Sequence, residues 1–212
     1  FSSRGIKRYM TFVVYRFFYA MIVSRKPIIL ASGSPRRAHL MSVLGFPFTV
    51  RESGVEENID EKLAPEEIAR GLALRKASTV ASQLSSGIVV GADTIVVLEG
   101  KILGKPATEE EAVGMLLALS GKTHTVFTGF ALVDAESKKS YISFERTEVT
   151  FRALRRDEVE RYVAAGSPMD KAGAYGIQDD YGAVFVEKIN GCFYNVVGFP
   201  ISKFHTALTN FI

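Results

Sequence analysis

One carboxylate stands in the middle of a stretch that is otherwise almost wholly apolar. Asp93 lies within residues 88–97, IVVGADTIVV, and Thr94 follows it directly. Burying a carboxylate is costly unless it has a partner, and a buried carboxylate at a cleft commonly holds a metal ion or acts as a general base. The pattern favours a functional Asp93. The alternative is a structural aspartate that backbone N–H groups or Lys105 satisfy.

A basic turn at residues 32–37, SGSPRR, is the second candidate. It follows a short apolar run, and a strand that ends in small and hydroxyl residues before a helix presents free backbone N–H groups to an anion. Arg36 and Arg37 add forked donors that match phosphate oxygens. The turn predicts phosphate binding, although by itself it is equally compatible with a capped helix that carries two solvated arginines.

Two lysines occupy unusual places. Lys76 shares a four-residue repeat with Ile68, Leu72 and Val80, so its ammonium group either reaches solvent or points into an anionic site. Lys105 lies in the sequence LGKP, whose glycine and proline fix the backbone around one charged side chain. Each lysine alone is more simply explained as structural, but the cations and one buried acid together favour a site for an anionic ligand.

Small residues dominate the segment 169–178, MDKAGAYGIQ, which ends in an uncharged amide. Such a loop can approach a ligand closely, and Gln178 can read a base edge because its amide both donates and accepts hydrogen bonds. The alternative is a tight surface turn.

Several other chemistries find little support in the sequence. The single cysteine, Cys192, excludes an intramolecular disulfide and a cysteine-based metal site. The sequence contains no P-loop, nucleophile-elbow or dinucleotide-binding motif. Among the acidic pairs, Glu56-Glu57 follows a predicted strand and best fits a role at a hard metal ion. The three histidines lack zinc-site spacing and are expected to be peripheral: His39, His124 and His205.

The elements that must position these residues alternate between strands and helices. Apolar runs predict strands at residues 27–31, 46–50, 88–97, 124–133, 141–151 and 183–189. Helical patterns and caps predict helices at residues 35–44, 65–84, 108–119, 154–165 and 197–211. This alternation predicts an α/β fold, a mixed twisted sheet flanked by helices in two lobes with a central cleft.

Bulk properties limit the partners. The net charge of +3 over 212 residues is too small to indicate nucleic acid and suits a small anionic ligand equally well. One cysteine is compatible with a reducing compartment, so a cytoplasmic protein is expected. Residues 1–26 are basic and aromatic, and their apolar run is too short for a membrane span of about 20 residues. We interpret them as an extension, either a targeting segment or a gene-model remnant, before one domain at residues 27–212; organelle targeting stays open.

Taken in order, the motifs LASGSPRR, VEE, GADTIV, LGKP, LSGKTH, MDKAGAYGIQ and NVVGFP make the chain resemble the Maf family of nucleoside triphosphate pyrophosphatases. The resemblance implies a metal-dependent enzyme with a Maf/Ham1-like fold, related to the inosine triphosphatases. Asp93 would be the proton acceptor, and Glu57 and Asp93 would hold Mg²⁺ or Mn²⁺. Three residues would shape substrate choice: Arg36, Thr94 and Gln178. The phosphate and metal environment would be completed by Ser32, Arg37, Glu57, Lys76 and Lys105.

The GAYGIQ form resembles the branch that hydrolyses dTTP and UTP, and the resemblance also implies a homodimer. After Gln178 the chain reads DDYG, which is longer and more acidic than the family's usual turn. The alternatives are a pyrophosphatase for 7-methyl-GTP or purine nucleotides, and a non-catalytic nucleotide-binding regulator of septum formation.

Overall fold

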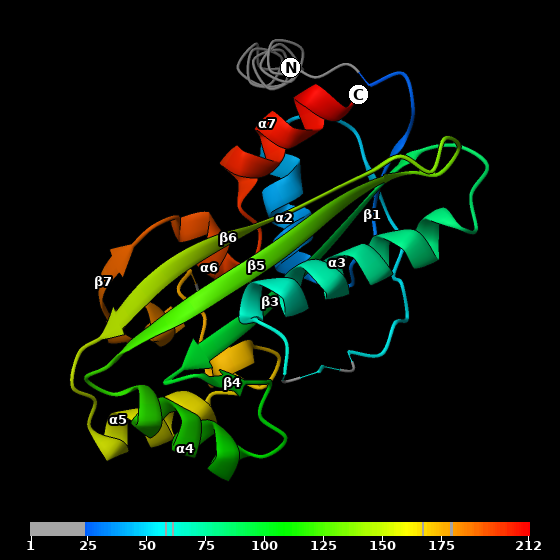
Figure 1. Cartoon of the computed structure of the whole chain (residues 1–212). Coiled ribbons are helices and arrows are strands. Elements are labelled where there is room, and N and C mark those ends of the chain that lie inside the picture. Colours follow the sequence, from blue (N-terminus) through cyan, green and yellow to red (C-terminus); the bar gives the residue numbers. More distant parts are fainter. Residues whose placement is uncertain (1–23, 58, 61, 167, 179) are drawn as a thin grey trace, which may run out of the picture.

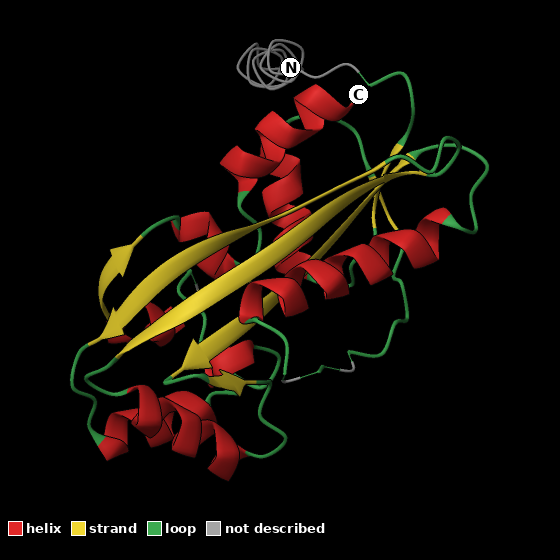
Figure 2. Ribbon diagram, viewed as in Figure 1, coloured by secondary structure: helices red, strands yellow, loops and turns green. Residues whose placement is uncertain are grey.

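A twisted sheet of seven strands forms the frame of the molecule (Figures 1 and 2). The structure is a computed structural model that describes residues 24–57, 59–60, 62–166, 168–178 and 180–212. The strands are β1 (Ile28–Leu30), β2 (Thr49–Val50), β3 (Ile88–Leu98), β4 (Lys101–Leu103), β5 (Thr123–Asp134), β6 (Ser140–Phe151) and β7 (Val186–Asn190). Their order is β2-β1-β3-β5-β6-β7, and β4 pairs with β3. The predicted mixed α/β fold is therefore confirmed.

Helices cover both faces of this sheet (Figure 2). α3 (Pro65–Ala81) lies along one face, while α2 (Pro35–Val43) and α7 (Ile201–Phe211) lie on the other (Figure 1). α4 (Glu109–Leu119) and α5 (Arg156–Ala164) pack together near one end of the long strands. The remaining elements are α6 (Phe193–Val197) and two 3₁₀ helices, η1 (Ala172–Ala174) and η2 (Asp180–Phe185).

β3 is paired at both ends of one edge but not in the middle. β1 runs parallel to β3 as far as Leu30 opposite Val90, and β4 pairs antiparallel from Leu103 opposite Val96. Residues 91–95 therefore have no partner strand on this edge within the described chain. Asp93 and Thr94 lie in this gap, and ligands of open α/β sheets commonly bind in crevices where strand connections diverge.

Two glycines let α3 lie unusually close to the sheet. A Cβ atom on Gly91 of β3 would lie 2.1 Å from the carbonyl oxygen of Ala73, and one on Gly129 of β5 would lie 2.2 Å from that of Ala69. No larger residue fits either position without moving the helix. This close packing brings Lys76 of α3 within reach of Asp93.

One core runs through both ends of the molecule. Leu30 and Met41 near the first end belong to the same buried cluster as Leu116 and Val159 of α4 and α5. β3, β5 and β6 pass through both ends without a break. The two predicted lobes therefore share one sheet and this buried cluster.

Several predicted boundaries were wrong. The strand expected at 183–189 begins only at Val186, because residues 180–185 form η2. The helix expected at 197–211 is two helices: Gly198 adopts a left-handed conformation (φ 115°) that ends α6, and α7 begins after Pro200. β4 was not predicted. Within the described residues, no helix is long and apolar enough to cross a membrane.

Most of the extension, residues 1–23, lies outside the described residues. Lys26 is described, and its ammonium group lies 2.8 Å from a carboxylate oxygen of Asp134 at the end of β5.

Candidate active site

A cavity of about 440 Å³ opens at the unpaired edge of β3. Its walls come from the turn before α2, the loop after β2, α3, β3, the β4–α4 loop, the segment 170–178 and the chain after α6. The cavity brings together all nine residues proposed from the sequence: Ser32, Arg36, Arg37, Glu57, Lys76, Asp93, Thr94, Lys105 and Gln178.

A buried lysine links the two carboxylates on the floor of this cavity. Lys76 donates hydrogen bonds to Oδ1 of Asp93 and, at 2.7 Å, to Oε1 of Glu57. Asp93 is 5% exposed and Lys76 is 7% exposed. A buried ion pair with such short contacts offsets much of the cost of burying its charges, whereas either charge alone would be strongly unfavourable.

Glu57 lies where the cavity meets solvent. Partial burial by itself would raise the pKa of its carboxyl group, but the hydrogen bond from Lys76 and the charges of Lys76, Lys105 and Arg37 outweigh this effect and lower the pKa. The Lys105 ammonium group lies 4.0 Å from the other Glu57 oxygen. Glu57 is therefore ionised at neutral pH and faces cations on two sides.

The turn before α2 has the geometry of an anion site. Ser34 caps the helix, and its hydroxyl accepts a hydrogen bond from the backbone N–H of Arg37. The Ser32 hydroxyl accepts from the backbone N–H of Ser34 at 3.2 Å. The first residues of α2 line the cavity beside Gly33, and the positive end of a helix favours negative ligands.

Arg37 connects three parts of the cavity wall through its side-chain hydrogen bonds. Its guanidinium donates to the Gly198 carbonyl at 3.1 Å, to Thr94 Oγ1 at 3.2 Å and to Ser32 Oγ at 3.4 Å. Burial lowers the pKa of Arg37, and the negative charges of Asp93 and Glu57 oppose this shift. The contacts fix one positive charge between α2, β3 and the end of α6.

Arg36 reaches across the mouth of the cavity. Its guanidinium contacts the Asp170 carboxylate at 2.6 Å, and Lys171 contacts the other oxygen of that carboxylate at 2.8 Å. This contact joins the basic turn to the segment that carries Gln178, whose exposed side chain lies at the rim.

A family model described as Maf-like protein matches residues 27–211. The chain belongs to the Maf family. A dTTP/UTP pyrophosphatase of Desulforamulus reducens is 50% identical over 186 residues, which cover 88% of this chain and 97% of the relative. A dTTP/UTP pyrophosphatase of Bacillus cereus (strain ATCC 10987) is 51% identical over 186 residues, which cover 88% of this chain and 90% of the relative. A solved HAM1 protein from Coxiella burnetii aligns with a TM-score of 0.49 and 17% identity, over 87% of this chain and 99% of that one.

Sequence reasoning missed four residues of this Maf-family cavity. Asp170, Lys171 and Tyr175 lie in the segment 169–178, where the sequence predicts a role only for Gln178. Glu52 lies in the loop after β2, and its carboxylate would be 2.7 Å from a Cβ atom on Gly33. Lys171 carried a usable signal, because a charged residue within a run of small residues is often held in a specific contact.

The expectation that all three histidines are peripheral was wrong for His124. Its side chain is buried, and its Nε2 lies 2.7 Å from the Tyr175 hydroxyl. Burial lowers the pKa of His124 to about 4. The imidazole is therefore neutral at physiological pH and supports the cavity wall from behind, through Tyr175.

The donor set of the cavity fits a hard divalent ion that is shared with a phosphate ligand. Within the described part of the chain, no group of three His, Cys, Asp or Glu residues is placed to hold a metal ion. Two carboxylates, Asp93 and Glu57, converge on Lys76. Mg²⁺ is typically bound by one or two carboxylates together with substrate phosphates and water, so these residues suffice only when the substrate supplies the other ligands.

Proposed function

We propose that this chain hydrolyses dTTP and UTP to the nucleoside monophosphate and pyrophosphate. The names of the relatives support the substrates. The observation that carries the proposal is the buried pair of Asp93 and Lys76, which lies at an unpaired strand edge beside a helix N-terminus. A nucleotide-binding module without catalysis has no need to bury a carboxylate there.

The cavity suits a polyphosphate. Arg36, Arg37, Lys76 and Lys105 surround it with positive charge, and the turn before α2 adds backbone N–H groups. Such groups stabilise the charge that develops on phosphate oxygens during transfer, because they are oriented before the substrate arrives. Asp170 and Glu57 hold two of these cations in place until the substrate takes over the contacts.

Asp93 is proposed as the proton acceptor. Lys76 engages Oδ1 of the carboxylate, so Oδ2 accepts the proton of the attacking water. As the water oxygen bonds to the α-phosphorus, the bond from that phosphorus to the bridging oxygen breaks and pyrophosphate leaves. Glu57 and Asp93 would hold Mg²⁺ or Mn²⁺, which when bound would polarise the phosphate oxygens.

Substrate choice is assigned to three residues at the cavity wall. Thr94 is fixed by Arg37 and by Thr128 at 2.9 Å, while Arg36 and Gln178 lie nearer the rim. The Gln178 amide can donate to one pyrimidine edge atom and accept from another. A cytoplasmic location and a homodimer stay predictions of the family resemblance.

The test is pyrophosphate release from dTTP, UTP, CTP, 7-methyl-GTP and ITP, each with Mg²⁺, with Mn²⁺ and with a chelator. Metal-dependent turnover that favours dTTP and UTP is expected. Preference for 7-methyl-GTP or ITP would keep the pyrophosphatase and overturn the pyrimidine assignment. No turnover by folded protein would overturn the enzyme and favour a nucleotide-binding regulator.

A further inference from the structure

Gly176 and Gly182, which flank Gln178 in the sequence, lie in direct contact. A Cβ atom on Gly182 would lie 2.7 Å from the carbonyl oxygen of Gly176 and 2.9 Å from the hydroxyl of Tyr162. The backbones at positions 176 and 182 are therefore in direct contact, with Gln178 between them. The position of Gln178 then depends on what holds η2, which begins at Asp180.

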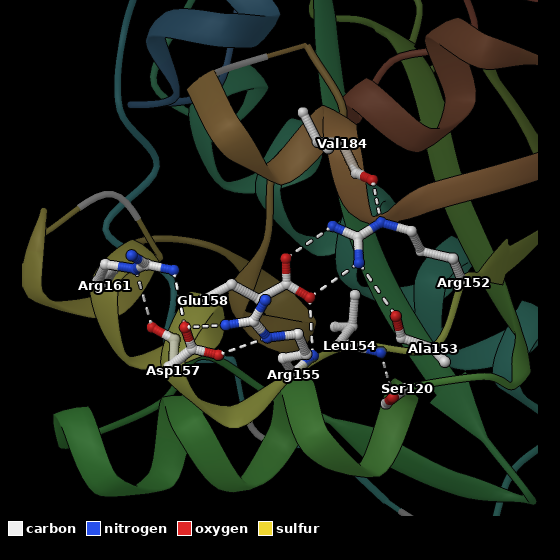
Figure 3. A network of polar contacts seen from close by, with 9 residues as sticks. All are labelled: Ser120, Arg152, Ala153, Leu154, Arg155, Asp157, Glu158, Arg161 and Val184. Carbon is white, nitrogen blue, oxygen red and sulfur yellow. Dashed lines mark hydrogen bonds and ion pairs between the residues drawn. The ribbon is translucent and has the colours of Figure 1, made fainter.

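Arg152 lies just after β6 and donates hydrogen bonds to two main-chain carbonyls of η2. The Arg152 guanidinium donates from Nε to the Val184 carbonyl at 2.9 Å (Figure 3), and its backbone N–H donates to the Phe185 carbonyl at 3.0 Å. Phe185 is fully buried, and the guanidinium carbon lies 5.9 Å from the centre of its ring. Arg152 thus holds two successive residues at the end of η2, Val184 through its guanidinium and Phe185 through its backbone N–H.

Glu158 of α5 fixes this arginine in turn (Figure 3). The two carboxylate oxygens accept hydrogen bonds from Nη1 and Nη2 of Arg152 at 2.8 and 2.9 Å, and Oε1 also accepts from the backbone N–H of Arg155 at 2.7 Å. Bidentate charged pairs of this kind set orientation as well as energy. Glu158 is 9% exposed, and the hydrogen bonds from Arg152 and Arg155 hold the pKa of its carboxyl group at about 2.

We propose that the Arg152–Glu158 pair is a positioning device for nucleotide discrimination, acting on the base-reading amide through η2. The inference rests on the proposed function, since it takes Gln178 as the residue that reads the base. Neither Arg152 nor Glu158 lines the cavity, so their loss leaves the phosphate and proton-transfer machinery in place. The predicted signature is a changed KM and base preference with a nearly unchanged kcat.

The test compares Arg152→Met with Arg155→Met in the full chain. Arg155 is a matched control: it belongs to the same network (Figure 3) and pairs with Asp157 at 2.6 Å, but its side chain is 77% exposed and makes no hydrogen bond to the described part of η2. For Arg152→Met, the ratio of kcat/KM for UTP to that for CTP should fall about fivefold, the effect of one hydrogen bond. The change should lie in KM, with kcat altered less than about threefold. Arg155→Met should leave the ratio unchanged.

Amide hydrogen exchange gives a readout that needs no turnover. Exchange at residues 180–185 should quicken in Arg152→Met but not in Arg155→Met. If exchange quickens while the UTP:CTP ratio stays at the wild-type value, the positioning inference is overturned and the pair is purely structural. If the wild type itself hydrolyses neither nucleotide, the proposed function fails, whereas the exchange result still reports whether Arg152 holds η2.

Two milder variants cover the case in which Arg152→Met does not fold. Arg152→Lys keeps the positive charge but cannot form the bidentate hydrogen bonds of a guanidinium. Glu158→Gln keeps a hydrogen-bonding side chain but loses the negative charge. Each should show a smaller shift of the UTP:CTP ratio in the same direction, with Arg152→Lys nearer to wild type. Wild-type ratios in both variants would refute the proposal.

Discussion

Replacing Gly91 by alanine is predicted to impair catalysis without touching a charged group. The new Cβ atom would start 2.1 Å from the Ala73 carbonyl oxygen and 2.8 Å from the Ala77 backbone nitrogen. Both atoms belong to the backbone of α3, on either side of Lys76. Because neither can rotate away, α3 itself must move.

The size of the effect follows from that distance. Contacts of a Cβ atom below 3.0 Å are essentially never seen, so the helix must shift by about 1 Å. Overpacking of this kind costs about 1–3 kcal/mol, which for a chain of this length lowers Tm by about 2–12 °C. A misplacement of about 1 Å between catalytic groups can reduce turnover about 100-fold, and here it would separate Lys76 from Asp93.

Gly71→Ala in the same helix is the matched control. Gly71 is exposed, and a Cβ atom there would meet nothing within 4 Å. Alanine at that position should stabilise the helix by about 0.5–1 kcal/mol and leave kcat/KM unchanged. The two variants are compared by thermal unfolding and by pyrophosphate release from UTP.

The reasoning fails if Gly91→Ala keeps the wild-type kcat/KM. A normal kcat/KM with a lowered Tm would mean that the catalytic geometry tolerates movement of α3. A normal Tm as well would mean that the close approach of α3 to β3 is wrong.

Three further predictions concern single side chains. Asp93→Asn should keep a hydrogen bond to Lys76 and still fold, with a lowered Tm because Lys76 retains only Glu57 as a charged partner, but it should lose proton acceptance and at least about 100-fold in kcat; turnover within tenfold of wild type, in folded protein, would remove Asp93 from that role. Gln178→Ala should lower the UTP:CTP preference more than it lowers kcat, and a fixed ratio would exclude it as the base reader. His124, with its pKa of about 4 in the folded chain and an ordinary pKa of 6.5 when unfolded, binds a proton more readily in the unfolded state. Stability should therefore fall between pH 6.5 and 4 by up to about 3 kcal/mol. Urea unfolding at pH 7 and pH 4.5 measures this loss, which His124→Gln should reduce; an equal loss in the variant would show that other groups cause it.

Asp93 and Lys76, the charged centre of the site, could be predicted because each is a charged residue within an apolar pattern. Asp93 interrupts an apolar strand, and Lys76 interrupts an apolar helix stripe. Each departure has a cost that only a partner can offset. Glu52 gave no such signal, since it is a polar residue in a polar loop and only tertiary structure brings it to the cavity.

The β3–β4 hairpin and the burial of His124 were not predicted, although the sequence contains a signal for each. β3 and β4 are joined by Glu99 and Gly100, both with positive φ, and a two-residue turn that ends in glycine is a hairpin signal. His124 alternates with Val126 and Phe130 on one side of β5, so strand periodicity indicated an inward side chain. The strand order could not be read in this way, because it depends on pairing between distant segments.

The uninterrupted strands constrain how the enzyme can admit its substrate. Since β3, β5 and β6 cross from one end of the molecule to the other with continuous pairing, the two ends can move relative to each other only as far as the paired sheet can twist or bend. At the rim, the Arg36–Asp170 ion pair is the contact that we expect an entering nucleotide to exchange for its own phosphates.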